Sequence, residues 1–274
     1  MALFPNSAYS MRRAAWLRSR MSAKAKERLS VTAPPFAGSR EWTFRLPGCS
    51  AGKTFGRKKM TEQTYPSPVL SHRRADLAVH AIGLLAILTA GGVLVYKSVL
   101  NLDPTLALAV VIYVLCALAS NLASVAYHFS TWHNRRKLLR RIDHAAIYPS
   151  ITGTFTPLFV LAGTSWTMAL LWICWGLTAL AAWNKITNET VKSRWSTASY
   201  LGLGGMGLCA LPDYTDFPIA TLWCVLAGAA AYAIGTVFYA RKSMPYRYAV
   251  WHQWVNIGGT LMFAGIWVAL ATQW

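Results

Sequence analysis

Seven apolar segments follow one another after residue 75, and they constrain the fold more than any other feature of this 274-residue sequence. Most are long enough to cross a hydrocarbon core of about 30 Å at a rise of about 1.5 Å per residue. They cover residues 76–96, 105–128, 144–162, 166–183, 197–212, 217–239 and 249–271. The fifth is short and rich in glycine, which suits close helix packing better than exposure to lipid. We therefore predict an all-α fold, a polytopic membrane protein with a seven-transmembrane helix bundle.

The composition agrees with a membrane location. Hydrophobic residues make up 55% of the chain and charged residues only 13%, whereas soluble domains carry roughly 25% charged residues. The net charge of +18 could indicate nucleic-acid binding, but the basic residues do not form one face. They lie before the first apolar segment and in short loops, where they can contact anionic headgroups. We expect membrane lipids as partners and no nucleic acid.

The chain divides into three parts. Residues 1–59 hold 13 Lys and Arg and contain no apolar run long enough to cross a bilayer. We expect this part to be a disordered basic tail, an organelle transit peptide, or a mis-annotated extension, with translation starting at Met60; we favour the last. Residues 60–75 form a polar cytoplasmic lead, and residues 76–272 form the transmembrane domain.

The loops predict the orientation of the bundle. Thirteen basic residues lie on one side of the membrane, before the first segment and after the second, fourth and sixth. The loops on the other side contain Lys97 as their single basic residue, together with aspartates. The positive-inside rule then places the amino terminus in the cytoplasm and Trp274 outside, in the inner or plasma membrane.

Polar side chains at helical spacing run through three of the predicted helices. The stripes are Ser120, Ser124 and His128; Asp143, His144, Tyr148 and Thr152; and Tyr248, His252 and Asn256. Ionisable residues at membrane depth are costly, so they are the first candidates for function. The predicted topology places His128, Asp143 and His252 at the cytoplasmic face, and this combination resembles a metal site with an open coordination position.

Each of these residues also has a structural interpretation. His128 could cap its helix at the interface, and His252 could be a packed core histidine. Asp143 could occupy a helix N-terminus, where the helix dipole favours a carboxylate. Asp76 and His80 form a further polar pair, one turn apart on the first segment; we interpret His80 as structural or as a support for the site rather than as a direct ligand.

The ordered motifs resemble those of the hemolysin III family, which belongs with the progestin and adiponectin receptors (PAQR). The resemblance covers about residues 70–272 and includes the Ser124-x3-His128 motif, the Arg-Ile-Asp-His motif around Asp143, and Trp251-His252 near the start of the last segment. It implies a seven-helix fold with its amino terminus inside and a zinc site at the cytoplasmic face.

In the family pattern, the histidine of the Ser-x3-His motif and two histidines spaced His-x3-His on the last helix hold the zinc. An aspartate holds a metal-bound water. Carried over, these positions are His128, His252 and Asp143, but the first histidine of the last pair is Tyr248 here. A neutral phenol is a poor zinc ligand, so either Asp143 binds the metal directly, His144 substitutes, or the chain has lost the metal.

Three functions remain open at this point. The leading hypothesis is a protein of membrane lipid homeostasis that acts as a zinc-dependent hydrolase on a lipid amide or ester. In it, His128, His252 and Asp143 form the metal site, while Asp143 and Ser124 act in catalysis. The second is a non-catalytic sensor or structural protein of the bilayer, which Tyr248 favours. A cytolysin fits less well, because no soluble domain is apparent.

Overall fold

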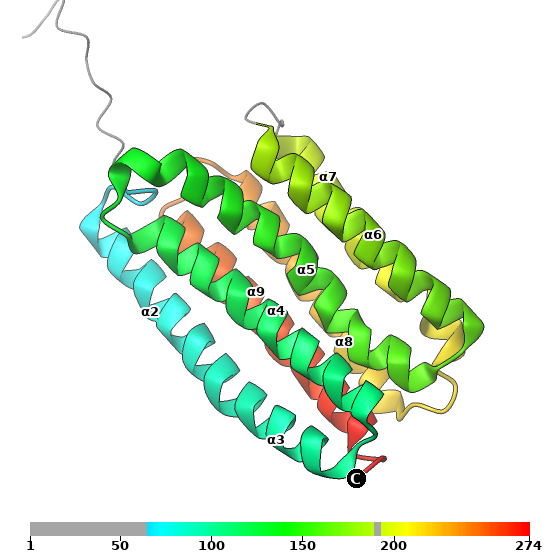
Figure 1. Cartoon of the computed structure of the whole chain (residues 1–274). Coiled ribbons are helices and arrows are strands. Elements are labelled where there is room, and N and C mark those ends of the chain that lie inside the picture. The colour runs from blue at the N-terminus through cyan, green and yellow to red at the C-terminus, as the bar shows by residue number, and fades with distance from the viewer. Residues whose placement is uncertain (1–64, 189–192) are drawn as a thin grey trace, which may run out of the picture. The chain divides into compact units, whose positions relative to one another are not determined.

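The computed structural model describes residues 65–188 and 193–274, and within these ranges all regular structure is helical (Figure 1). The elements are α2 (Leu70–Ala86), η2 (Ile87–Gly91), α3 (Gly92–Asn101), α4 (Pro104–Phe129), η3 (His133–Arg135), α5 (Arg136–Ala162), α6 (Ser165–Thr187), α7 (Ser193–Leu208), η4 (Leu211–Asp213), α8 (Ile219–Ala240) and α9 (Arg247–Leu270). The predicted all-α class is confirmed. The predicted extension over residues 1–59 lies outside the described ranges.

Among the described residues, six helical stretches are long and apolar enough to cross a membrane. The first of them joins α2, the π-helical turn η2 and α3 into one helix of 32 residues, and it begins at Leu70, inside the predicted polar lead. The fifth apolar segment forms α7, which has 16 residues and therefore rises about 24 Å. A crossing by α7, and with it the count of seven, stays a prediction.

The helices run side by side as a bundle, and neighbours in the sequence pack together (Figure 1). Helix α4 packs against α5, α5 against α6, and α8 against α9. The chain closes on itself because α2 packs against α9 as well as against α4. This closure brings the first and last spans next to each other, with the second span beside them.

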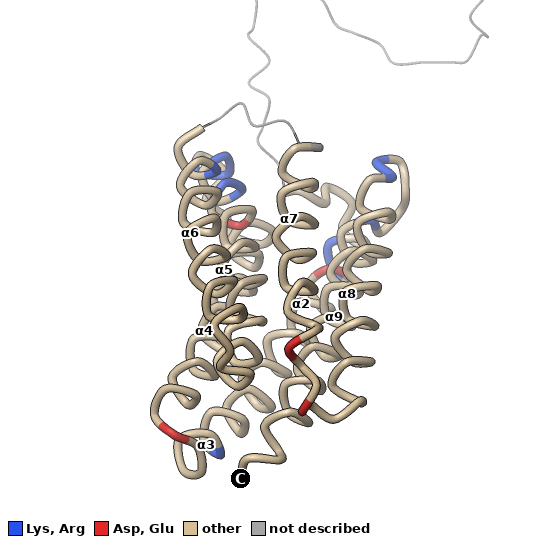
Figure 2. Tube along the Cα trace, turned by 90° about the vertical axis from the view of Figure 1, so that its right-hand side faces the viewer, with Lys and Arg blue, Asp and Glu red and all other residues tan. Residues whose placement is uncertain are grey.

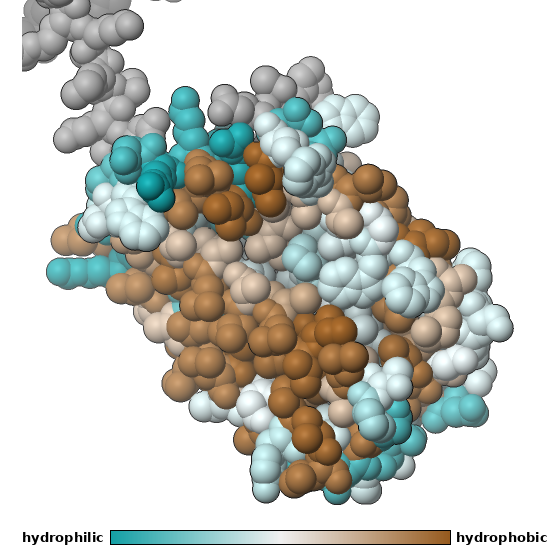
Figure 3. Space-filling view, viewed as in Figure 1, coloured by the Kyte–Doolittle hydropathy of each residue, from teal (hydrophilic) through white to brown (hydrophobic). Residues whose placement is uncertain are grey.

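Charged and apolar side chains are separated along the bundle. Figure 2 shows that most Lys and Arg of the described ranges gather at one end of the helices. At the opposite end, the Lys97 ammonium lies 5.5 Å from the ring of Trp267 and 5.1 Å from the ring of Trp274. Brown, hydrophobic side chains cover much of the face drawn in Figure 3. This distribution agrees with a bundle that spans a bilayer, while the side on which each end lies stays a prediction.

The glycine-rich helix α7 contains one glycine on which the packing depends. A Cβ at Gly207 would lie 2.1, 2.2 and 2.4 Å from three ring atoms of Phe155, whose ring is buried and stacked on Phe159. A Cβ at Gly205 would meet nothing within 4 Å. Gly207→Ala should therefore destabilise the protein by about 1–3 kcal/mol through overpacking. Gly205→Ala, the matched control, should be neutral or stabilising because alanine favours helix.

Thermal unfolding of the two variants in detergent micelles would test this difference. Equal unfolding midpoints for Gly207→Ala and Gly205→Ala would mean that α7 does not pack on α5 as described.

Candidate metal centre

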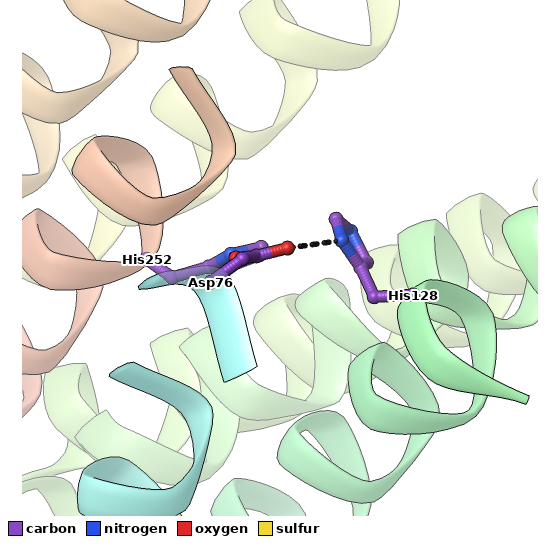
Figure 4. Close-up of side chains that lie close together, drawn as sticks. All are labelled: Asp76, His128 and His252. Carbon is purple, nitrogen blue, oxygen red and sulfur yellow. Dashed lines mark hydrogen bonds and ion pairs between the residues drawn. The ribbon is translucent and has the colours of Figure 1, made fainter. Parts of the chain in front are cut away.

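Three helices bring one carboxylate and two imidazoles together at the basic end of the bundle. Asp76 of α2, His128 of α4 and His252 of α9 lie within contact of one another, and Figure 4 shows the Asp76 carboxyl group beside the two rings. We call these three residues the aspartate–histidine cluster. Their potential ligand atoms all lie within 4.8 Å of one another. Within the described ranges, no other group of three or more His, Cys, Asp or Glu side chains has this proximity.

Each oxygen of the Asp76 carboxylate accepts a hydrogen bond from a different histidine. The Nδ1 of His128 lies 2.7 Å from Oδ2, and the Nδ1 of His252 lies 2.7 Å from Oδ1. The side chain of Asp76 is only 1% exposed, compared with 3% for His128 and 13% for His252. Since a buried carboxylate is costly unless it is paired and hydrogen-bonded, this arrangement accounts for an ionised group at membrane depth.

The close approach of α2 and α9 depends on a glycine next to the cluster. A Cβ at Gly83 would lie 2.5 Å from Oδ1 of Asn256, so only glycine leaves room for that side chain. The Nδ2 of Asn256 in turn donates to the carbonyl oxygen of Val79 at 2.9 Å. His80 lies one turn before Gly83 in α2, and His252 lies one turn before Asn256 in α9. The close contact at Gly83 therefore brings the first and last spans together at the cluster.

A third histidine, His80, lies against the cluster. Its Nδ1 is 2.8 Å from the backbone oxygen of Asp76, one turn earlier in α2, and its ring centroid is 4.0 Å from that of His252. The ring is buried, and its Nε2 lies 3.0 Å from the hydroxyl oxygen of Ser124. His80 is therefore part of the same polar network as the cluster.

Ser124 and Asp143 lie next to the cluster. The Ser124 hydroxyl, one turn before His128 in α4, lies between Nε2 of His80 and Nε2 of His252, which is 3.4 Å away. Asp143 lies two turns inside α5, which begins at Arg136, and so does not occupy the helix N-terminus that one interpretation of the sequence gave it. It lies beside Ser124 and interacts electrostatically with His128. The Ser124 hydroxyl thus faces two histidine nitrogens, and a second carboxylate lies next to that hydroxyl.

A buried arginine holds the loop that follows His128. The guanidinium of Arg136 donates to the backbone oxygens of Tyr127 and Ser130, the latter at 2.7 Å, and contacts Nδ1 of His133 at 3.0 Å. This loop links α4 to α5, so Arg136 positions the ends of the two helices that carry His128 and Asp143.

The sequence predicted part of this arrangement. It predicted a metal site of His128, Asp143 and His252 with Ser124 next to it. The structure brings His128 and His252 together and places Ser124 next to them, with Asp143 near Ser124. The sequence did not assign Asp76 to the group, although the spacing of Asp76 and His80 had marked a polar pair on the first span. Asp143 is not one of the three clustered residues, so its role as a direct ligand stays a prediction.

The remaining candidates lie close by. The ring of Tyr248 stands edge-on to that of His128, with centroids 5.0 Å apart, so the position that departs from the family pattern does adjoin the cluster. The Nε2 of His144 lies 4.0 Å from a carboxylate oxygen of Asp143. Like Asp143, His144 remains outside the group of three.

Comparison with known proteins identifies the family. The family model described as "Haemolysin-III related" matches residues 74–263, which include every residue of the cluster. A "Hemolysin-3 homolog" from Bacillus subtilis (strain 168) is 34% identical over 145 residues, covering 52% of this chain and 68% of the relative. A "Hemolysin-3" from Bacillus cereus is 29% identical over 210 residues, covering 75% of this chain and 94% of the relative. The chain therefore belongs to the haemolysin-III related family and is a multi-pass membrane protein.

Proposed function

We propose that the aspartate–histidine cluster binds a zinc ion and that the protein uses it to hydrolyse an amide or ester bond of a membrane lipid. The observation that carries the proposal is the cluster itself. Two imidazoles and a carboxylate converge from three different helices, buried at the basic end of a membrane bundle. Ionisable groups in such a place are rare and usually functional.

The chemistry of the donor set fits zinc. Imidazole nitrogen is an ordinary zinc ligand, and a ligating histidine commonly donates its second ring N–H to a carboxylate, as His128 and His252 do to Asp76. The Asp76 carboxylate also brings a negative charge to the cluster, where the ring nitrogens of His128 and His252 are its hydrogen-bond partners. A divalent cation would complete this charge balance. His128 and His252 would supply nitrogen donors, and Asp76 would supply the charge and the hydrogen-bond acceptors that orient them.

The residues around the cluster would perform the remaining chemistry. A bound zinc ion would supply Lewis-acid polarisation of a carbonyl group and would increase the acidity of water. Asp143 would orient the attacking water and accept its proton. The Ser124 hydroxyl would donate a hydrogen bond to the oxygen on which negative charge develops. The Ser124 hydroxyl lies at Nε2 of His252, whose Nδ1 faces Asp76, and Asp143 lies next to Ser124.

The surroundings favour a lipid as the substrate. An apolar groove of about 580 Å³ lies between η2–α3 and α9, with Thr89, Val93, Phe263 and Trp267 in its walls. Thr260, also in its wall, follows His252 by eight residues, or roughly 12 Å along α9. An acyl chain in this groove would lie along the same helix pair that carries the cluster. The basic residues near the cluster would attract anionic headgroups, and the proposed orientation places this end in the cytoplasm.

Metal analysis of the purified protein tests the proposal. We expect about one zinc ion per chain, and loss of this zinc to a strong chelator should abolish fatty-acid release from a panel of a ceramide, a phospholipid and a diacylglycerol. Added zinc should restore the activity. Absence of stoichiometric metal, together with thermal stability that the chelator leaves unchanged, would instead make the cluster a hydrogen-bonded staple of a non-catalytic membrane protein.

A further inference from the structure

We infer that His80 is a third nitrogen donor to the metal, and that Asp76 serves all three histidines as a common hydrogen-bond acceptor. The inference rests on the proposed function, because it concerns the same ion. It assigns a ligand on the first span. The Ser124-x3-His128 motif of the second span and the pattern around His252 on the last span do not predict one there.

The first argument is the direction in which the three rings are held. Each Nδ1 faces an oxygen of Asp76: His128 faces Oδ2 at 2.7 Å, His252 faces Oδ1 at 2.7 Å, and His80 faces the backbone oxygen at 2.8 Å. An ionised carboxylate and a carbonyl oxygen can only accept hydrogen bonds. Each Nδ1 must therefore carry the proton, and in each neutral ring Nε2 keeps a free lone pair.

This pattern is typical of histidines that bind metals. A ligating histidine almost always donates its second ring N–H to a carboxylate or a backbone carbonyl, which sets the tautomer and the orientation of the ring. His128 and His252 use the carboxylate and His80 uses the carbonyl, so one residue provides all three acceptors.

The second argument is that the three rings adjoin one another and share too few hydrogen-bond donors. Their nitrogen atoms do not form a group within 4.8 Å, as the ligand atoms of the aspartate–histidine cluster do, so a bound ion would draw the His80 ring closer. The centroid of the His80 ring lies 4.0 Å from that of His252 and 5.4 Å from that of His128, and the latter two are 4.8 Å apart. The Ser124 hydroxyl lies within reach of Nε2 on both His80 and His252, but it has only one proton to donate. The Nε2 lone pair of either His80 or His252 is therefore left without a hydrogen-bond donor from Ser124, whereas one cation could bind both nitrogens.

Position 248 offers a way to test the assignment. Tyr248 lies one turn before His252, and its ring centroid is 5.0 Å from that of His128. A histidine placed there would present a ring nitrogen at the edge of the cluster from α9. If His80 provides the third nitrogen, a histidine at position 248 should compensate for its loss.

The experiment measures zinc affinity and the absorption spectrum of the cobalt(II)-substituted protein for the wild type, His80→Asn, His80→Asn/Tyr248→His and His72→Ala. Asparagine can still donate to the Asp76 backbone oxygen but lacks a nitrogen equivalent to Nε2, so the variant should fold. Removing a residue that only hydrogen-bonds to a metal ligand typically lowers metal affinity by about 10–100-fold. We expect the zinc affinity of His80→Asn to fall by more than this. The cobalt spectrum should change, and the double variant should regain most of the affinity.

His72→Ala is the matched control, because His72 lies on the same helix but contacts the ring of Tyr246. It should leave the affinity unchanged. Wild-type affinity in His80→Asn would overturn the inference while leaving the proposed metal site intact. The inference would also be overturned if His80→Asn bound zinc weakly but kept the wild-type cobalt spectrum, and if adding Tyr248→His did not raise its zinc affinity. A wild-type protein without metal would refute the proposed function itself.

Discussion

Replacing His128 or His252 with alanine should remove both the bound zinc and lipid hydrolysis, whereas Asp143→Asn should remove hydrolysis alone. Each histidine is an expected nitrogen donor, and their rings lie on different helices with centroids 4.8 Å apart. Loss of either would leave too few donors to retain the ion. Asp143 lies beside Ser124 and outside the cluster, so its amide variant should bind zinc normally.

The size of the Asp143→Asn effect follows from its proposed role. A general base contributes typically about 10²–10⁴-fold to a rate, and an amide cannot accept the proton from water. We therefore expect the turnover number to fall by that factor at unchanged zinc content. Zinc would be measured by mass spectrometry on the same samples in which fatty-acid release is followed. His72→Ala, on α2 but in contact with the ring of Tyr246, is the control and should retain both properties.

Two results would contradict this division of roles. Normal turnover in His128→Ala or His252→Ala would exclude them as ligands of a catalytic metal. Loss of zinc in Asp143→Asn would mean that Asp143 binds the metal directly, which is one of the alternatives that the sequence left open.

The fold was predictable because the bilayer allows few solutions. An apolar segment long enough to cross the membrane must satisfy its backbone hydrogen bonds internally, so it becomes a helix. The helix at residues 197–212 was the difficult case, and it forms α7 with only 16 residues. Of its glycines, Gly207 packs against Phe155 of α5, whereas a Cβ at Gly202, Gly204 or Gly205 would meet nothing within 4 Å; the predicted close packing therefore holds at one glycine.

The site was predictable only in part, because helical spacing describes one helix at a time. The spacing predicted that His128 lies one helical turn after Ser124, on the same face, and it identified His252 on the last span. It could not show that α2 closes the bundle against α9, since that contact depends on Gly83 admitting Asn256. Asp76 therefore looked like the partner of His80 alone. In the folded chain its carboxylate reaches two histidines that lie 52 and 176 residues away.

Asp76→Ala should be the most damaging single substitution in the bundle. It removes the carboxylate acceptor of His128 and His252 and so leaves two buried N–H groups without a partner. Breaking a buried pair by removing one member typically costs about 3–5 kcal/mol. The variant should also lose zinc, because the rings would no longer be held in one tautomer and orientation.

Unfolding of Asp76→Ala in mixed micelles, compared with the chelator-treated wild type, separates the two effects. Asp216→Ala, at an exposed position in the loop before α8, is the matched control and should change stability by no more than about 0.5 kcal/mol. If Asp76→Ala were no less stable than the metal-free wild type, the carboxylate would contribute nothing to the bundle beyond the metal. A lower stability than the metal-free wild type would instead show that Asp76 joins the three helices on its own, before any ion binds.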